Sequence, residues 1–305
     1  MNQAAQTSNQ KLFTGLSVAL VTPFDDKEHI DLKSLEKLIE HIDKDADNLV
    51  LFGTTGESPT LSLEERRDML RFVRERNHGR WRIILGLGSN DTHQLVHRVE
   101  DVDPEGIDGI LSVVPYYSKP NERGIYKHFA SVAEASPLPI VLYNIPSRTG
   151  VNLTVETLRR LRETYPEKIV AIKEASGSAI PERVAVLRDT MDSDFTILSG
   201  DDNLNLRAIK AGADGAVSVV ANAFPRLSRA TLQTEEGALA EQTDTELTTL
   251  YKLLFSEGNP TGIKALLHDM NLLAFNTLRL PLVSASEELY NQLKAESARL
   301  LHLAL

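Results

Sequence analysis

Cysteine is absent from this 305-residue sequence. Disulfide bonds, thiolate metal sites and cysteine nucleophiles are therefore excluded together. The absence of disulfides suits a reducing compartment, and we expect a cytoplasmic protein.

An excess of positive charge is also absent: 43 Asp and Glu outnumber 33 Lys and Arg, which gives a net charge of −10. A protein with this charge is a poor candidate for binding nucleic acid or an anionic membrane surface. No uncharged apolar run approaches the roughly 18 residues that a membrane span requires. Residues 1–10 are polar and lack an apolar core, which predicts a frayed tail and not a signal peptide.

What the chain does contain is a repeated alternation of two kinds of segment. Short apolar runs bounded by Gly, Pro, Ser or Asp are typical of strands buried on both faces, and they occur at 16–21, 48–52, 82–87, 109–114, 139–143, 169–172, 195–198 and 215–220. Segments with helical spacing lie between them, such as those at 31–42, 62–77, 92–102, 122–135 and 154–164. Ser62 followed by Glu65 predicts a capping box at the start of one of these helices.

Eight strand–helix units predict an α/β fold, specifically a closed (β/α)₈ TIM barrel with a helical C-terminal extension. A doubly wound open sheet is the alternative. We assign residues 1–223 to the barrel core, with 1–12 as an N-terminal tail, and 224–305 to the last barrel helix and the extension. A turn is expected within the extension at Gly258-Asn259-Pro260.

Lys173 is the most informative residue, because it ends the apolar run Val170-Ala171-Ile172. Burial lowers the pKa of a lysine from its usual value of about 10.4. A neutral amine is a nucleophile that can form a Schiff base with a carbonyl substrate. The alternative is a structural pair with Glu174, but neighbouring residues of a strand point to opposite faces, which favours catalysis.

Further polar residues follow the other predicted strands, where a barrel carries its chemistry. Tyr143 could exchange a proton, and Arg148 offers a planar fork for a carboxylate; the alternatives are a strand-end aromatic and a surface ion pair. Thr54 and Thr55 supply hydroxyls or cap the next helix. Gly200 permits close approach of a ligand or simply makes a turn.

Signals for other chemistries are weak. Gly86-Leu87-Gly88 lacks the third glycine of a dinucleotide fingerprint. His93 and His97 share a helix face but have no evident third ligand, so we interpret them as surface histidines. Asp201, Asp202 and Glu57 are too few carboxylates for a metal-dependent barrel lyase, and the predicted site is metal-free.

These residues resemble a known family, the dihydrodipicolinate synthase/N-acetylneuraminate lyase class I aldolases, over nearly the whole chain from Leu16 to about Leu282. The motifs that carry the resemblance are Gly53-Thr54-Thr55-Gly56-Glu57-Ser58, Pro115-Tyr116-Tyr117-Ser118-Lys119-Pro120, Tyr143-Asn144-Ile145-Pro146-Ser147-Arg148-Thr149-Gly150, Ile172-Lys173-Glu174-Ala175-Ser176-Gly177 and Ser199-Gly200-Asp201-Asp202. Within the family, the chain is most similar to the lyases that condense pyruvate with L-aspartate 4-semialdehyde to 4-hydroxy-tetrahydrodipicolinate, on the route to diaminopimelate and lysine.

The resemblance implies a role for each candidate residue. Lys173 would form the imine with pyruvate, without a metal or dissociable cofactor, and Tyr143 would be the central acid and base. Thr54 and Tyr117 would complete a proton relay, with Tyr117 reaching in from a neighbouring subunit of a dimer or a dimer of dimers.

The remaining implied roles concern substrate binding. Thr55 and the backbone near Gly200 and Val217 would hold the pyruvate carboxylate. Arg148 would bind the carboxylate of the semialdehyde, and it argues against the two enzyme alternatives, an N-acetylneuraminate lyase or a 2-keto-3-deoxy-sugar-acid lyase. A non-catalytic binding paralogue is less consistent with the complete catalytic set.

Two departures from the family pattern stand out. Gln94 occupies the position of a glutamate that holds the inhibitor lysine in some members, and Leu63 and Arg66 replace a nearby pair of histidines, although Asn90 and Tyr116 remain. We therefore expect weak or no feedback by lysine. Gly262 replaces a second proline after Asn259-Pro260, which leaves the local loop geometry open.

Overall fold

The computed structural model describes residues 11–233 and 237–304, so the predicted tail at residues 1–10 lies outside the described residues. Eight parallel strands close into a barrel in sequence order: β1 (Gly15–Ala19), β2 (Asn48–Leu51), β3 (Arg82–Gly86), β4 (Gly109–Val113), β5 (Ile140–Asn144), β6 (Ile169–Glu174), β7 (Thr196–Ser199) and β8 (Gly215–Ser218). β8 pairs with β1 to close the ring. The prediction of a TIM barrel is confirmed, and the open-sheet alternative is wrong.

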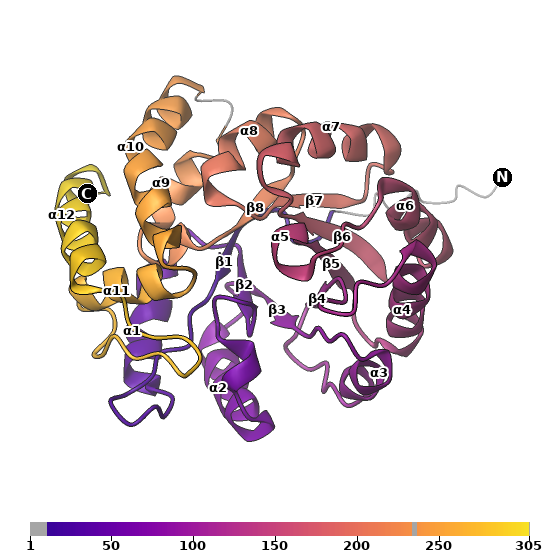
Figure 1. The fold of residues 1–305 in the computed structure, drawn as a ribbon, viewed down its shortest axis with the longest axis horizontal. Coiled ribbons are helices and arrows are strands. Elements are labelled where there is room, and N and C mark those ends of the chain that lie inside the picture. The colour runs from indigo at the N-terminus through magenta and orange to yellow at the C-terminus, as the bar shows by residue number, and fades with distance from the viewer. Residues whose placement is uncertain (1–10, 234–236, 305) are drawn as a thin grey trace.

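Helices surround the strands, as Figure 1 shows. They are α1 (Leu32–Ile42), α2 (Leu63–Asn77), α3 (Thr92–Glu100), α4 (Glu122–Ala135), α5 (Pro146–Thr149), α6 (Val155–Thr164), α7 (Ile180–Thr190), α8 (Asn205–Lys210) and α9 (Pro225–Ala230). The capping box of α2 is present: Ser62 Oγ accepts from Glu65 N, and Glu65 Oε2 accepts from Ser62 N. Apolar side chains of strands and helices form one continuous core.

Three further helices follow the barrel: α10 (Gly237–Ser256), α11 (Thr261–Asp269) and α12 (Glu287–Ala304). They pack against one another on one side of the barrel, near α1 in Figure 1. The predicted turn at Gly258-Asn259-Pro260 joins α10 to α11. No helix in the described part of the chain is both long enough and apolar enough to cross a membrane.

Gly262 is explained by the packing of α11 on α10. A Cβ atom at this position would lie 2.6 Å from the carbonyl oxygen of Leu254 and 2.8 Å from its Cα. The residue that departs from the family pattern therefore allows the two helices to approach at their backbones.

Candidate active site

Two cavities lie at opposite ends of the barrel. The larger, about 1020 Å³, is lined by Gly15, Asn48 and Arg82, the first residues of β1, β2 and β3. The other, about 420 Å³, is lined by side chains at or beyond the carboxyl ends of the strands, including Tyr143 and Arg148. Because the carboxyl ends of the strands carry the chemistry of these barrels, the smaller cavity, called here the strand-end cavity, is the candidate active site.

Lys173 and Tyr143 lie side by side at this end of the barrel. They are direct partners in the pairing of β5 with β6, and both are 7% exposed. The Lys173 Nζ lies 4.3 Å from the centroid of the Tyr143 ring. Tyr143 lines the strand-end cavity, whereas Lys173 is not among its lining residues and lies directly beside the phenol. Lys173 forms no ion pair with any described residue.

Glu174 faces away from this amine and has other partners. Its carboxylate is fully buried and accepts from Asn144 Nδ2 at 2.9 Å and from Arg183 Nε at 2.9 Å. The alternative of a structural Lys173–Glu174 pair is therefore wrong. Since Asn144 and Glu174 directly follow Tyr143 and Lys173, this second network holds both strand ends in register from the opposite face of the sheet.

Gly200 follows β7 and lies directly against the lysine. A Cβ atom here would lie 2.8 Å from Ala175 Cβ and 3.0 Å from Lys173 Cε. These distances are shorter than normal carbon contacts, so only glycine fits this close to Ala175 and Lys173. A turn alone does not account for this residue.

Asp202 holds the loop that follows Val217 and the end of β8. Its buried carboxylate accepts from the backbone N–H groups of Val219 and Val220, at 2.8 and 3.1 Å. Burial raises the pKa of Asp202, and it also raises the pKa of neighbouring Asp201, with the positive charge of Lys173 acting in the opposite direction. Asp202, which the sequence offered only as part of an inadequate metal site, thus holds the loop that follows β8.

The two threonines after β2 occupy different environments. Thr54 is exposed and lines the strand-end cavity, whereas Thr55 is 3% exposed and its Oγ1 accepts from Asn259 Nδ2 at 2.9 Å. Neither threonine caps the next helix, because Ser62 is the N-cap of α2. The capping alternative is wrong.

Arg148 lies on the one-turn helix α5 and lines the strand-end cavity with an exposed side chain. It forms no ion pair with any described residue, so the alternative of an ordinary surface salt bridge is wrong. A planar cation without a carboxylate partner at a cavity mouth is suited to an anionic ligand.

Tyr117 is not brought into the cavity of its own chain. It is 88% exposed, with a φ of 72° that is uncommon for an aromatic residue, while the preceding Tyr116 does line the cavity. His93 and His97 lie exposed on α3 with their Nε2 atoms 3.3 Å apart.

The extension contributes residues that the sequence analysis missed. The strand-end cavity is lined in part by Asn259, Pro281 and Leu282. Lys264, which lies between Asn259 and Pro281 in the chain, donates from Nζ to Glu57 Oε1 at 2.6 Å, and both side chains are fully buried. The sequence signal that could have revealed the buried pair was a lysine within the otherwise apolar segment 262–267.

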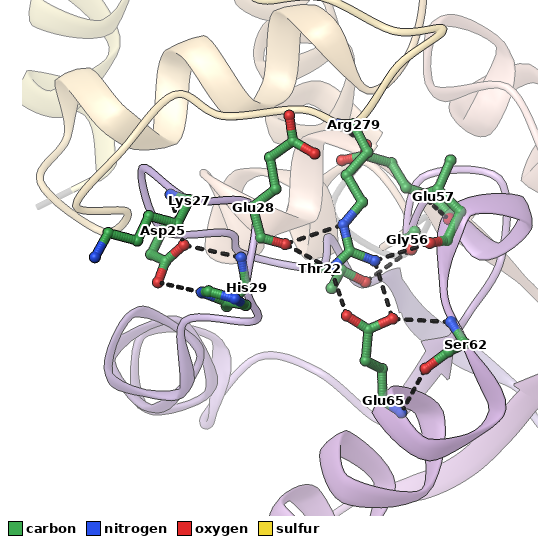
Figure 2. A network of polar contacts seen from close by, with 11 residues as sticks. Thr22, Asp25, Lys27, Glu28, His29, Gly56, Glu57, Ser62, Glu65 and Arg279 are labelled. Atoms are coloured by element: carbon green, nitrogen blue, oxygen red, sulfur yellow. Dashed lines mark hydrogen bonds and ion pairs between the residues drawn. The ribbon is translucent and has the colours of Figure 1, made fainter.

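Arg279 joins the extension to two loops of the barrel. Figure 2 shows its guanidinium between the Glu28 carbonyl and the Glu65 carboxylate, with Nε 3.0 Å from Glu28 O and Nη1 3.0 Å from Glu65 Oε2. Nη1 also donates to Thr60 O at 2.8 Å, and the Arg279 backbone N–H donates to Glu57 Oε2 at 3.1 Å. Hydrogen bonding to Arg279 lowers the pKa of Glu65 to about 2. The segment that forms one wall of the cavity is thereby anchored.

Fold and site together define a (β/α)₈ barrel that presents a nearly buried lysine beside a tyrosine at the carboxyl ends of adjacent strands. Residues 12–299 match the model of the dihydrodipicolinate synthetase family. The chain belongs to this family, which confirms the resemblance read from its motifs.

Individual relatives support the same family assignment. The chain is 47% identical over 277 residues to the 4-hydroxy-tetrahydrodipicolinate synthase of Porphyromonas gingivalis, covering 90% of this chain and 92% of the relative. Among solved structures, the same enzyme from Methylacidiphilum fumariolicum SolV superposes with a TM-score of 0.88 at 40% identity, covering 96% and 99% of the two chains. The dihydrodipicolinate synthase from Acinetobacter baumannii, solved in complex with pyruvate, gives 0.87 at 36% identity, covering 93% and 97%.

Proposed function

We propose that this protein is a Schiff-base lyase that condenses pyruvate with L-aspartate 4-semialdehyde to 4-hydroxy-tetrahydrodipicolinate, in diaminopimelate and lysine biosynthesis. The observation that carries the proposal is the Lys173 amine, nearly buried beside Tyr143 and without an ion-pair partner among the described residues. Relatives that cover most of this chain are named for the same synthase activity.

Lys173 acts as the nucleophile. Its amine attacks the ketone carbon of pyruvate, water leaves, and the imine withdraws electrons so that the methyl group can release a proton. Tyr143 lies beside the amine and exchanges protons in these steps, so the reaction needs no metal or dissociable cofactor. Thr55 and the backbone near Gly200 and Val217 hold the pyruvate carboxylate.

The enamine carbon then forms a bond to the aldehyde carbon of the second substrate. Arg148, whose guanidinium forms no ion pair with any described residue, binds the carboxylate of the semialdehyde. The amine of that substrate finally displaces Lys173 and closes the ring, which regenerates the free enzyme.

Tyr117 acts in the cavity of a neighbouring subunit, where it joins Thr54 in a relay that carries protons between Tyr143 and solvent. Its nearly complete exposure supports this role, since a residue that serves its own cavity would line it. The active protein is therefore a dimer or a dimer of dimers. Its location is the cytoplasm, a reducing compartment that suits a chain without cysteine.

Feedback by L-lysine is weak or absent in this proposal. Gln94 is neutral and its Oε1 accepts from Arg98 Nη2 at 3.2 Å, so it offers no carboxylate to an ammonium group. We expect no inhibition of the initial rate at physiological lysine concentrations, and half-inhibition within that range would contradict this expectation.

Turnover tests the proposal as a whole. We expect pyruvate-dependent consumption of L-aspartate 4-semialdehyde that disappears in Lys173→Ala, and borohydride trapping of pyruvate on Lys173 detected by mass spectrometry. Trapping without turnover would retain the class and reject the acceptor, in which case sugar-acid acceptors are tried next. Failure of both assays would instead favour a binding protein.

A further inference from the structure

Asn259 lies in the C-terminal extension and reaches the strand-end cavity. It contacts Thr55, which is 204 positions earlier in the sequence. Asn259 is one of the residues that line the cavity, whereas the almost buried Thr55 is not. The Nδ2 of Asn259 donates to Thr55 Oγ1 at 2.9 Å. The other amide atom, Oδ1, is buried and has no hydrogen-bond partner among the described residues. Neither amide atom bonds to the turn in which Asn259 lies, so the side chain is not needed to close that turn.

The surrounding contacts hold Asn259 in place. Gly262 lets α11 pack on the backbone of Leu254, and two residues further on, Lys264 forms the buried pair with Glu57. Glu57 itself follows Thr55 by two residues. The same short segment of the extension is therefore fixed to the same short loop of the barrel at two points, the ion pair and the Asn259–Thr55 hydrogen bond.

We propose that Asn259 is a positioning residue that orients the Thr55 hydroxyl toward the carboxylate of pyruvate. This inference rests on the proposed function and adds a role for the extension in substrate binding.

The reason lies in the donors and acceptors of a hydroxyl group. A threonine hydroxyl has one hydrogen, and an amide NH₂ can only donate. When Nδ2 of Asn259 occupies an acceptor site of Thr55 Oγ1, the hydrogen of that hydroxyl must point elsewhere, and it is free to donate to a substrate anion. Donation to a carboxylate is a charge-assisted bond, which is stronger than a bond between neutral groups.

The test compares Asn259→Ala with Asn259→Asp in the full-length oligomer. Pyruvate binding is measured without the second substrate, as the pyruvate concentration that gives half-maximal borohydride trapping on Lys173. Asn259→Ala is expected to raise this concentration about tenfold, because one orienting hydrogen bond is lost. Asn259→Asp is expected to raise it about 100-fold, because a carboxylate accepts the Thr55 hydrogen and repels the substrate anion.

Further variants separate positioning from a structural effect. Asn291→Ala removes an asparagine from the exposed face of α12 and should leave trapping unchanged. In a Thr55→Val background, Asn259→Ala should have no further effect on trapping, because the two residues act as one unit. The KM for the semialdehyde should remain within about twofold of wild type in Asn259→Ala, whereas general damage to the site would change it as well.

Each outcome decides the inference. Half-maximal trapping of Asn259→Ala at the wild-type pyruvate concentration, or weaker effects in Asn259→Asp than in Asn259→Ala, would overturn it. If Asn259→Ala does not fold, Asn259→Asp keeps the side-chain shape and tests the same hydrogen. Failure of the proposed function is distinguishable, because the wild-type protein would then trap no pyruvate on Lys173.

Discussion

The buried pair of Lys264 and Glu57 should be strongly coupled in stability. Both side chains are fully buried, and Nζ lies 2.6 Å from Oε1. Removing one partner of such a pair leaves a buried charge without compensation, which typically costs about 3–5 kcal/mol. We therefore expect Lys264→Met and Glu57→Gln each to lower the midpoint of thermal unfolding by about 6–10 °C, at about 2 °C per kcal/mol for a chain of this size.

The double variant is the informative one. Replacing both charges removes the attraction and the cost of burying them together, so the double variant should be more stable than the sum of the single losses predicts. Calorimetry or urea unfolding of the four proteins at pH 7 measures this difference. A double variant whose loss equals the sum of the two single losses would refute the coupling.

The pH dependence gives a second readout. Burial lowers the pKa of Lys264 from 10.5 to about 8, although Glu57 acts in the opposite direction. Between these pH values the unfolded chain binds more protons than the folded chain, so this group makes the free energy of unfolding rise with pH, by up to about 3 kcal/mol. Lys264→Met lacks this contribution, and its curve against pH should be flatter than that of wild type over this window.

Three further predictions concern the proposed reaction. Co-refolding inactive Tyr117→Phe with inactive Lys173→Ala should restore activity, because one site of each mixed dimer combines intact residues from both chains; no recovery would place Tyr117 in its own site. Arg148→Ala should raise the KM for the semialdehyde about 100-fold, the cost of a lost charged pair, and leave borohydride trapping of pyruvate intact; equal losses in both assays would contradict its assignment. Gly200→Ala should abolish trapping, since its Cβ would lie 2.8 Å from Ala175 Cβ and 3.0 Å from both Glu174 O and Lys173 Cε. The control Gly237→Ala, with no described atom within 4 Å of the added Cβ, should behave as wild type; trapping by both variants would show that the site tolerates the added methyl group.

The sequence was sufficient to predict the barrel, because strands and helices are recognised from patterns within short segments. Each buried strand is a short apolar run and each helix an amphipathic one, so eight repeats define the fold without any knowledge of which segments touch. The order of the repeats also placed Tyr143, Arg148 and Lys173 at one end of the barrel. Their side-chain environments did not follow from this order. That Arg148 forms no ion pair with any described residue, for example, depends on every neighbour in space.

Tertiary structure alone decided how the extension participates. The bonds from Asn259 to Thr55 and from Lys264 to Glu57 join residues more than 200 positions apart, and such pairs leave no periodic trace in a single sequence. The steric need for Gly200 likewise arises only after Lys173 has been placed against it. The sequence by itself determined the barrel and the end at which its reactive side chains gather, because strand and helix patterns are local. Folding in three dimensions decided which distant residues hold those side chains, because hydrogen bonds and ion pairs depend on distance in space.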